Sequence, residues 1–406
     1  MSPRHAIVAG GGVAGLATAA ALAGTGWRVT LYERRPAGPA EEVGAGIQMS
    51  PNACRCLAAL GALEAVEAAA FAPRAAVLRD GRNGAVVYRA ALREAAVARW
   101  GAPYLHVHRA DLVQALADAA RARGVEIVPG TSVTGAVAAT EGDGEGIAAL
   151  LDNGARVAGH LLVAADGLGS RLRTHHFGPA APRFTGQTAW RATVPADRLG
   201  SAEIPPDATV WAAPGRHVVT YWLRGGSLAN LVAVEEQTQW REEGWSHPGD
   251  PAMLRASFAD FTAPVQALIG AAEAPLRWAL LERPAPDRWS QAIGQGAVAL
   301  IGDAVHPMLP FMAQGAAQAL EDAVALARHL RTPDLGVALT AWEAERRPRT
   351  SRVQAVSRTN GAMFHRHDGL QRRLSHALIG TVSTWAPGLA AGRLDWLYGH
   401  DAVAGP

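Results

Sequence analysis

Short apolar runs alternate with alanine-rich segments of helical length at the start of the chain and again near residue 300. Residues 6–9 and 297–301 are apolar throughout, which is typical of parallel strands buried on both faces. Residues 53–70 and 110–123 carry alanine and leucine at helical spacing. This order of strands and helices predicts an α/β fold with a mostly parallel sheet.

A second pattern, alternation of apolar and polar positions, covers residues 74–90 and much of residues 184–272. The turn signal Asp80-Gly81 divides the first of these segments into a hairpin. We therefore predict an antiparallel sheet that forms a second unit and presents one face to a cavity.

A glycine-rich turn follows the first predicted strand and opens an alanine-rich helix that extends to about residue 23. Gly10 makes the turn, Gly12 admits a pyrophosphate to the helix N-terminus, and Gly15 lets the helix pack on the strand. Glu33 ends the next strand about 20 residues on, where an acid binds the ribose hydroxyls of an adenosine. These spacings predict a dinucleotide site, and Arg34 or its neighbour flanks the adenine unless it is a solvated surface residue.

The segment that follows residues 297–301 has an unusual chemical character. Asp303 places an anionic acceptor at the carboxyl end of a strand, where open α/β sheets bind ligands. Pro310 stiffens the loop, and Gly315 and Ala316 open the next helix almost without side chains. Free N–H groups and the positive end of the helix dipole can therefore contact a flat, electron-rich ligand. A strand-ending turn and a flexible joint are the alternative interpretation.

Four more residues are candidates for chemistry. His217 and Tyr221 share one face of a predicted strand, where both can hydrogen-bond a phenol; ordinary sheet packing is the alternative. Asp166 ends the apolar run 161–165 and either caps the next helix or faces a ligand, and both can hold. Arg109 begins a helix, a position that is unfavourable for a cation unless an anion lies nearby.

The run GDAVHPMLPFMAQGAAQALEDA, residues 302–323, resembles the ribityl-binding motif of the single-component FAD-dependent aromatic hydroxylases. This is the para-hydroxybenzoate hydroxylase fold, and the similarity is strongest to its salicylate hydroxylase and 6-hydroxynicotinate 3-monooxygenase branch. The resemblance covers nearly the whole chain, in three separated motifs. It implies a Rossmann-like FAD-binding domain, an inserted β-sheet substrate domain and a C-terminal helical region. We expect the FAD-binding domain at residues 1–72, 98–182 and 275–330. The substrate domain is expected at residues 73–97 and 183–274, and the C-terminal helical region at residues 331–406.

The resemblance also implies roles for single residues. The loop that contains Gly46 passes near the flavin and lines the substrate cavity, so that Gln48 contacts the flavin or the substrate. Arg109 reaches toward the flavin and pyrophosphate, and Asp166 faces the pyrophosphate and the path of a nicotinamide. The chain departs from the nicotinate-hydroxylating branch at Gln48 and Phe311, where that branch has histidines.

The implied reaction uses FAD as cofactor, with NADH or NADPH as transient co-substrate. Reduced FAD and O2 form a C4a-hydroperoxide, which hydroxylates a small electron-rich aromatic, either phenolic or hydroxy-heteroaromatic and possibly carboxylated. We expect His217 and Tyr221 to activate the phenol, Pro310 and Phe311 to exclude water, and the helix end at residues 315–316 to stabilise charge at flavin N1. His306 is a weaker catalytic candidate. A flavin-dependent dehydrogenase or oxidase on the same fold, or a flavin-binding protein without turnover, remains open.

Composition narrows the class of protein further. The chain has 406 residues, of which 49% are hydrophobic and 18% charged, as in soluble globular proteins. All 38 basic residues are arginines and they are not clustered, so we expect no nucleic-acid partner. Cys54 and Cys56 are too close for an ordinary disulfide and have no further metal ligands nearby. We expect no metal, no membrane partner, no targeting segment, and a cytoplasmic monomer or homodimer.

Overall fold

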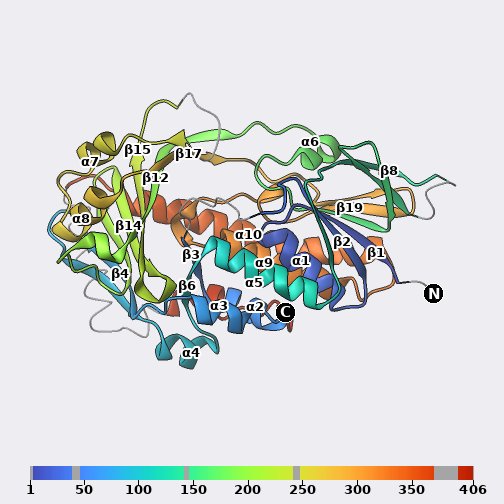
Figure 1. Cartoon of the computed structure of the whole chain (residues 1–406), viewed down its shortest axis with the longest axis horizontal. Helices are drawn as coiled ribbons and strands as arrows, with labels where there is room; N and C mark the ends of the chain where they lie inside the picture. Colours follow the sequence, from blue (N-terminus) through green and yellow to red (C-terminus); the bar gives the residue numbers. More distant parts are fainter. Residues whose placement is uncertain (1–2, 39–45, 141–145, 241–246, 370–391, 406) are drawn as a thin grey trace.

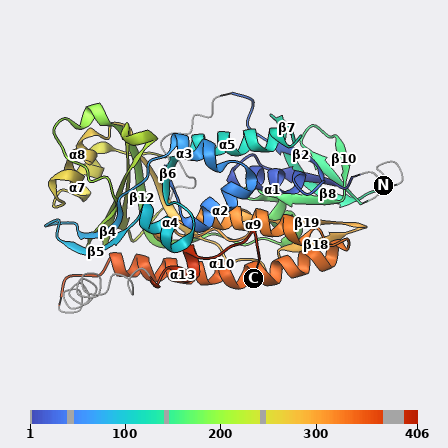
Figure 2. The same cartoon turned by 90° about the horizontal axis from the view of Figure 1, so that it is seen from below.

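The computed structural model describes residues 3–38, 46–140, 146–240, 247–369 and 392–405. Two units built on separate sheets lie next to each other along the longest axis of the molecule (Figure 1). A long C-terminal helix runs beneath both of them in the view of Figure 2. No helix of these residues is long and apolar enough to cross a membrane.

The first unit contains a six-stranded sheet in the order β18-β19-β11-β1-β2-β7. Five strands are parallel and β18 is antiparallel at the edge. Continuous apolar sequence buries the central strands on both faces. The strands are β18 (Ser290–Ile293), β19 (Gly296–Leu300), β11 (Leu161–Ala164), β1 (His5–Ala9), β2 (Arg28–Glu33) and β7 (Glu126–Pro129).

Helices and a small sheet cover this unit. Helix α1 packs against both α5 and α9, and α2 packs against α9. An antiparallel three-stranded sheet lies near β1 and β11, and α6 packs on its strand β8. The elements are α1 (Val13–Ala23), α2 (Pro51–Leu60), α3 (Leu63–Ala69), α5 (Arg109–Ala122), α6 (Arg171–Phe177), α9 (Gly315–His329), β8 (Val133–Ala138), β9 (Ile147–Leu151) and β10 (Arg156–Gly159).

The second unit is an eight-stranded, mainly antiparallel sheet in the order β16-β17-β12-β15-β14-β13-β4-β5. The predicted hairpin of residues 74–90 is its edge pair β4–β5. The strands are β16 (His247–Pro248), β17 (Leu276–Glu282), β12 (Arg183–Pro195), β15 (Leu228–Glu236), β14 (Arg216–Leu223), β13 (Ala208–Ala213), β4 (Ala75–Asp80) and β5 (Val86–Ala91).

One face of the eight-stranded sheet is covered by α7 (Pro251–Ser257) and α8 (Ala263–Ala271), which form a separate apolar core with it. The other face is turned toward the first unit. There it meets β3 (Gly46–Met49) paired with β6 (Leu105–His108), the turn η4 (Pro310–Met312) and the end of α10 (Leu335–Phe364). The antiparallel sheet expected from the alternation is therefore present, with one face toward the first unit.

Three details differ from the sequence-based expectations. The helix expected over residues 53–70 is two helices, because Gly61 adopts a left-handed conformation with φ 76° and ends α2. The sequence of residues 156–163 predicts a single strand, but the segment is divided between two sheets at His160. The arginine-rich run 346–349 predicts a solvated face in the C-terminal region, but Arg346 is fully buried.

Candidate functional site

The polar residues predicted to bind a cofactor come together at one edge of the six-stranded sheet. Strands β1, β11 and β19 are parallel neighbours, with Ala9 opposite Ala164 and Ala164 opposite Leu300. Because the three strands end at the same level, the loops that follow them meet there. Those loops contain the glycine turn, Asp166 and Asp303.

The glycine turn has the tight geometry that its sequence predicts. Gly10 has φ 110°, and a Cβ there would lie 2.5 Å from the carbonyl oxygen of Ala165. A Cβ at Gly15 would overlap the carbonyl oxygen of Gly10, so α1 packs tightly against the turn. At Gly12 the nearest atom to a Cβ would be the Arg109 guanidinium at 3.9 Å. The N-terminus of α1 therefore has open space in front of its N–H groups.

Glu33 lies beside this turn. Its carboxylate accepts hydrogen bonds from the backbone N–H of Gly11 at 2.6 Å and of Arg35 at 2.9 Å. Burial alone would raise the pKa of Glu33, but these two hydrogen bonds and the Arg35 guanidinium outweigh it and lower the pKa. Glu33 is therefore ionised and can accept further hydrogen bonds. Arg34 is exposed next to it, and Arg35 forms the ion pair with Glu33.

Asp166 both caps a helix and keeps one oxygen available. Its Oδ2 accepts hydrogen bonds from the backbone N–H groups of Arg171 at 3.0 Å and Leu172 at 3.3 Å, at the start of α6. Its Oδ1 is buried and has no hydrogen-bond partner among the described residues. Burial raises the pKa of this carboxyl group. A buried polar atom without a partner is unfavourable in isolation, so Oδ1 is suited to a ligand.

Asp303 lies at the opposite side of the same edge. It is accessible to solvent in the short helix η3 (Gly302–Ala304), although protein surrounds it closely enough to raise its pKa. His306 and Arg109 act in the opposite direction and lower that pKa. Arg109, at the unfavourable N-terminus of α5, thus has an anion nearby, as its position requires.

The loop between Asp303 and α9 is constrained. Pro310 is exposed, whereas Phe311 is buried under the end of α10 and would collide with any side chain at Gly361. Ala313 adopts a left-handed conformation with φ 51°, which is costly for a residue other than glycine. Helix α9 then begins at Gly315, where the nearest atom to a Cβ would be Cγ of Met308 at 4.0 Å. Its N-terminus, including Ala316, is thus accessible.

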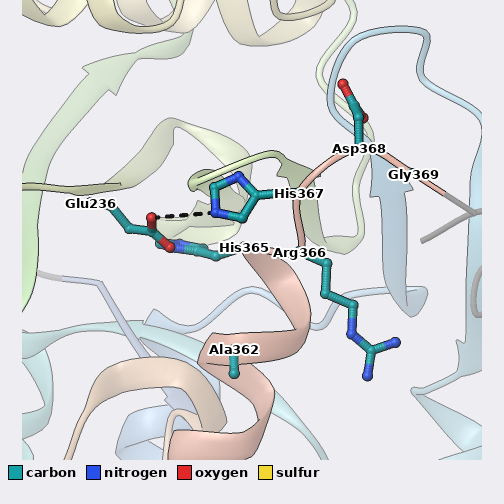
Figure 3. Close-up of a pocket in the computed structure, with 7 residues that line it drawn as sticks. All are labelled: Glu236, Ala362, His365, Arg366, His367, Asp368 and Gly369. Carbon is teal, nitrogen blue, oxygen red and sulfur yellow. Dashed lines mark hydrogen bonds and ion pairs between the residues drawn. The ribbon is translucent and has the colours of Figure 1, made fainter. Parts of the chain in front are cut away.

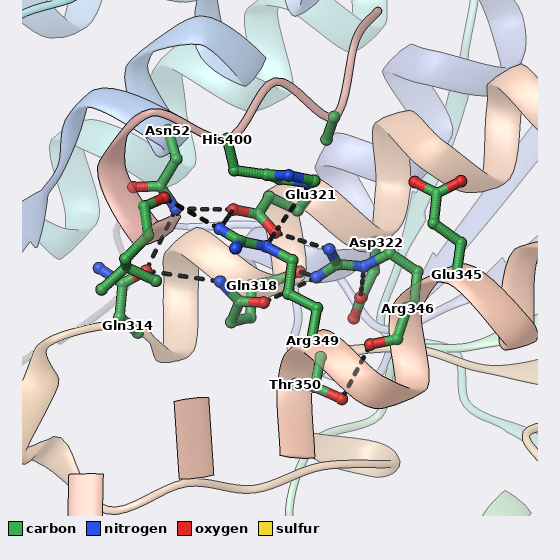
Figure 4. A network of polar contacts seen from close by, with 12 residues as sticks. Asn52, Gln314, Gln318, Glu321, Asp322, Glu345, Arg346, Arg349, Thr350 and His400 are labelled. Carbon is green, nitrogen blue, oxygen red and sulfur yellow. Dashed lines mark hydrogen bonds and ion pairs between the residues drawn. The ribbon is translucent and has the colours of Figure 1, made fainter. Parts of the chain in front are cut away.

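A buried polar network holds α9 in place (Figure 4). Glu321 binds Arg346 at 2.6 Å and is chelated by Arg349 at 2.6 and 2.7 Å. Asp322 accepts a 2.8 Å hydrogen bond from Arg346 and lies 2.5 Å from Nε2 of His306. Burial would raise the pKa of Glu321, but Arg346 and Arg349 lower it to about 2.

This network explains the positions of Arg346 and His306, for which the sequence predicted other roles. Arg346 is buried because it neutralises two acidic side chains of α9, so the expectation of a solvated arginine face is wrong at this position. His306 joins the loop to Asp322 and lies 5.2 Å from the ring of Trp289. It therefore braces the loop that carries Asp303.

The face of the eight-stranded sheet opposite the loop forms a wall of three cross-strand rows. His217 pairs through Val234 with Ala189, Val219 through Val232 with Arg191, and Tyr221 through Asn230 with Thr193. The alternate residues Val218 and Trp222 pack instead on the other face, toward α7 and α8. The shared face predicted for His217 and Tyr221 is thus present.

Two residues of this wall were missed by sequence reasoning. Arg191 lies between the rows of His217 and Tyr221, and its guanidinium is 4.5 Å from the centre of the Trp278 ring. Asn230 accepts a 3.0 Å hydrogen bond from the N–H of Gly46, while its buried Nδ2 lacks a partner in the part of the chain that the structure describes. Both residues lie at alternating positions of strands that the sequence predicts. Knowing which strands pair would have placed them on the same face as His217 and Tyr221, but the sequence alone does not give the pairing.

The two predicted catalytic side chains have different surroundings. His217 is buried against Phe311, with ring centres 5.4 Å apart, and its Nδ1 lies 2.7 Å from Nε2 of His365. Burial, followed by the nearby His365, lowers the pKa of His217 well below its ordinary value. Tyr221 packs on Gly46, and burial raises its pKa.

The β3–β6 pair packs against this wall. Gln48 accepts a 2.7 Å hydrogen bond from the hydroxyl of Tyr104, so this polar side chain is oriented by the protein. The ring of His106, opposite Gln48 in the pairing, lies 4.6 Å from that of Tyr221. Sequence reasoning assigned no role to His106, although it lies in the segment that precedes Arg109.

Comparison with known proteins places this geometry in a family. A model of the FAD binding domain family matches residues 4–357. The chain belongs to this family. Its sequence is 39% identical over 408 residues to 3-amino-4-hydroxybenzoate 2-monooxygenase PtmB3 of Streptomyces platensis, covering 99% of this chain and 97% of that protein. It is 36% identical to 6-hydroxynicotinate 3-monooxygenase of Bordetella bronchiseptica, covering 100% and 97%.

Solved structures of similar proteins have the same fold. Klebsiella pneumoniae HpxO complexed with FAD and uric acid matches with a TM-score of 0.80 at 27% identity, over 99% of this chain and 97% of that one. A substrate complex of salicylate hydroxylase matches with a TM-score of 0.78 at 26% identity, again over 99% and 97%. The predicted α/β fold with a Rossmann-like FAD domain is confirmed.

The chain is an FAD-dependent aromatic monooxygenase, as the sequence resemblance predicted. The residues present fit FAD: an open helix N-terminus at Gly12, an ionised acid at Glu33 and an unpartnered oxygen of Asp166 lie along one edge. NAD(P)H is the co-substrate typical of these monooxygenases. Within the described ranges, no cluster of His, Cys, Asp and Glu could hold a metal ion.

Proposed function

We propose that this monooxygenase hydroxylates a small phenolic or hydroxy-heteroaromatic acid that binds between the β14-β15-β12 face and the loop at Pro310. The observation that carries the proposal is the combination of His217 and Arg191 on one otherwise largely apolar wall. A base and a cation on the same face suit a ring with a hydroxyl and a carboxylate. Several similar enzymes act on such molecules, including 3-amino-4-hydroxybenzoate and 6-hydroxynicotinate.

The cofactor-binding residues proposed here follow the edge of the six-stranded sheet. The backbone N–H groups of the glycine turn formed by Gly10, Gly12 and Gly15 hold the pyrophosphate at the start of α1, because a helix N-terminus favours anions. Glu33 binds the adenosine ribose, with Arg34 at the adenine. When bound, FAD supplies electrons taken from NAD(P)H and the position at which O2 is activated.

The remaining cofactor contacts are proposed on the other side of that edge. Asp303 accepts from the ribityl hydroxyls, and Arg109 and Asp166 flank the pyrophosphate. The open N-terminus of α9 at Gly315 and Ala316 faces the flavin ring, where its dipole stabilises negative charge. Gly46 approaches the ring from β3.

We propose that the two ends of the substrate contact different residues of this wall. His217 and Tyr221 are four residues apart, which corresponds to about 13 Å along a strand, so they contact different parts of one aromatic molecule. Because His365 occupies Nδ1 of His217, Nε2 is the atom that accepts the phenolic proton. Arg191 binds the carboxylate, and Nδ2 of Asn230 and the hydroxyl of Tyr221 donate hydrogen bonds near it.

Two nearby groups complete the site that we propose. Phe311 packs on His217 and Pro310 lies beside it, so that together they exclude water from the reacting atoms. Gln48, oriented by Tyr104, contacts the ring of the substrate from the β3 side.

The test compares NADH oxidation by the FAD-loaded protein with and without 3-amino-4-hydroxybenzoate, 6-hydroxynicotinate or 3-hydroxybenzoate. We expect one of these acids to accelerate NADH oxidation and to yield a product that carries one more oxygen atom. Reduction of the flavin by the aromatic alone, without nicotinamide and under anaerobic conditions, would instead establish a dehydrogenase or oxidase. A protein that binds FAD but oxidises NADH with none of them would support the non-catalytic alternative.

The domain boundaries and the setting of the protein are also proposals. We retain residues 1–72, 98–182 and 275–330 as the FAD domain, 73–97 and 183–274 as the substrate domain, and 331–406 as the C-terminal region. Buried free thiols at Cys54 and Cys56 support a cytoplasmic location. A monomer or homodimer without membrane or nucleic-acid partner is proposed, and sedimentation of the FAD-loaded protein would test its oligomeric state.

A further inference from the structure

A chain of hydrogen-bonding groups connects His217, on the wall of the eight-stranded sheet, to the protein surface. Nδ1 of His217 lies 2.7 Å from Nε2 of His365, and Nδ1 of His365 lies 3.2 Å from Oε1 of Glu236. The side chains of both histidines are buried, whereas that of Glu236 is 46% exposed. Three residues from β14, the end of α10 and the end of β15 thus connect the interior with solvent.

The backbone keeps this chain in place. His365 ends α10, and its carbonyl oxygen accepts a 3.1 Å hydrogen bond from the N–H of Gly215, in the turn before β14. The carbonyl oxygen of Gly215 in turn accepts a 2.9 Å hydrogen bond from the N–H of Glu236. The turn therefore ties the ends of α10 and β15 to the strand of His217.

The direction of every hydrogen bond in the chain follows from Glu236. An ionised carboxylate only accepts, so Nδ1 of His365 must carry the hydrogen. A neutral imidazole with hydrogen on Nδ1 has a lone pair on Nε2, so Nδ1 of His217 must be the donor to it. Nε2 of His217 is consequently left with the lone pair, which is the form a base needs.

We propose that His217, His365 and Glu236 form a proton relay that carries the proton of the substrate hydroxyl to solvent, an inference that rests on the proposed function. Nε2 of His217 takes the hydroxyl proton while its Nδ1 gives a proton to Nε2 of His365. Nδ1 of His365 gives its proton to Glu236, which releases it to water. The net change is a bound phenolate, one proton in solution and both histidines with hydrogen on Nε2 instead of Nδ1. The reverse sequence returns a proton to the product oxygen and restores the original tautomers.

The charge of the relay suits this transfer. Burial, the largest influence, lowers the pKa of His365, while Glu236 raises it and His367 lowers it. Both histidines are therefore neutral in the resting protein. A relay of neutral groups moves the proton without leaving a buried cation behind, which would be costly in an apolar interior.

The outer end of the relay opens into a surface pocket of ≈ 480 Å³ lined by Glu236, His365 and residues 366–369 (Figure 3). Nε2 of His367, an exposed side chain, lies 4.0 Å from Oε2 of Glu236. Arg366 points away from the carboxylate in the same view. The amide of Gln187 lies 3.3 Å from Nδ1 of His365, and an orientation with its oxygen toward that atom fits the donor assigned above. Water and His367 can both accept the proton from Glu236.

The first arm of the test needs no substrate. Nitrogen NMR of the FAD-loaded protein with 15N-labelled histidine should show His217 with hydrogen on Nδ1, its signals being assigned with His217→Ala. In Glu236→Gln the side-chain amide can both donate and accept a hydrogen bond, so it no longer requires hydrogen on Nδ1 of His365. We therefore expect both tautomers of His365 to be populated. A wild-type His217 with hydrogen on Nε2 would overturn the relay.

The second arm measures proton release. FAD-loaded protein is mixed without oxygen with 3-amino-4-hydroxybenzoate in weak buffer that contains a pH indicator, and binding is followed by flavin absorbance. His365→Gln and Glu236→Gln should bind the acid as the wild type does but release the proton about tenfold more slowly. The loss is smaller than the 10²–10⁴-fold expected for the base itself, because water can partly replace a relay group.

Glu282→Gln is the matched control, since Glu282 is a salt-bridged surface carboxylate of the same sheet that lies outside the relay. Its proton release should equal that of the wild type. Equal rates in all variants, or binding without proton release in the wild type, would overturn the relay. A wild type that binds neither this acid nor 6-hydroxynicotinate nor 3-hydroxybenzoate would count against the proposed function, and the NMR result would then decide the relay alone.

Discussion

At the scale of single residues, the cofactor edge depends on two carboxylates. Glu33 is ionised and already oriented by backbone N–H groups, and Asp303 lies at the end of β19 near Arg109. We expect Glu33→Ala and Asp303→Ala each to weaken FAD binding by about 1–3 kcal/mol, the cost of an unmet hydrogen bond to a charged group. Titration of apoprotein with FAD measures this. Unchanged affinity in both variants would contradict the cofactor assignment.

His217 is the residue on which phenol activation depends. His217→Ala should leave FAD binding intact and lower hydroxylation by about 10²–10⁴-fold, which is typical of a positioned base. Peroxide formation should rise relative to product, because a ring that stays protonated reacts slowly. The measurement is product and peroxide per NADH across pH. Normal turnover, coupling and pH profile in the variant would make His217 an ordinary sheet residue.

We expect Arg191 to give the enzyme its preference for phenols that carry a carboxylate. Arg191→Met should raise the KM for 3-amino-4-hydroxybenzoate roughly 10- to 100-fold, since a hydrogen bond to a charged group contributes about 1.5–3 kcal/mol. The KM for 2-aminophenol, which lacks the carboxylate, should change little. Arg198→Met, at an exposed arginine paired with Glu273, serves as the control. Equal changes for both compounds would show that Arg191 acts only through packing.

At the scale of elements, the contact of α9 with α10 carries most of the buried charge. Arg346→Met leaves Glu321 and Asp322 without their shared cation, and breaking a buried pair in this way costs about 3–5 kcal/mol. Denaturant unfolding measures the loss. The neighbouring exposed Arg347→Met, which removes an ion pair to Glu343, should cost less than about 1 kcal/mol. Similar losses in the two variants would contradict the account of the network.

Element boundaries show where local sequence was sufficient. Alternation over residues 74–90 and much of residues 184–272 predicted the second sheet, because one face of its strands is buried and the period is visible. The helix of residues 53–70 was predicted as continuous, since Gly61 alone does not reveal whether it adopts the left-handed conformation that ends α2. Similarly, nothing local separates β10 from β11, which differ only in the strands that they pair with.

At the scale of the whole molecule, the buried titratable groups predict acid sensitivity. Burial lowers the pKa of His106 to about 3 and that of His176 to about 4, from 6.5. Because the folded values lie below the unfolded ones, stability is greatest above about pH 6.5 and falls as the pH drops toward 4. Glu321, with a pKa of about 2, adds a further loss below about pH 4.5.

Melting temperatures measured between pH 8 and pH 4 test this expectation. They should fall steadily below about pH 6.5, and the fall should be smaller in His106→Gln, in which one imidazole fewer has to be buried uncharged. A flat profile down to pH 5 would show that the buried histidines do not control stability.

The sequence by itself determined the order of strands and helices, the glycine turn, the acids at strand ends and the membership of the FAD-binding family. Those features are local: they depend on side-chain periodicity, on backbone conformations that require glycine, and on the spacing of a motif. Only the tertiary structure decided that Arg191 shares a sheet face with His217, that Arg346 is buried, and that His365 and Glu236 continue the chain from His217. Each of these depends on which strands pair and on where a helix 148 residues away in sequence ends, and such long-range contacts leave no local pattern.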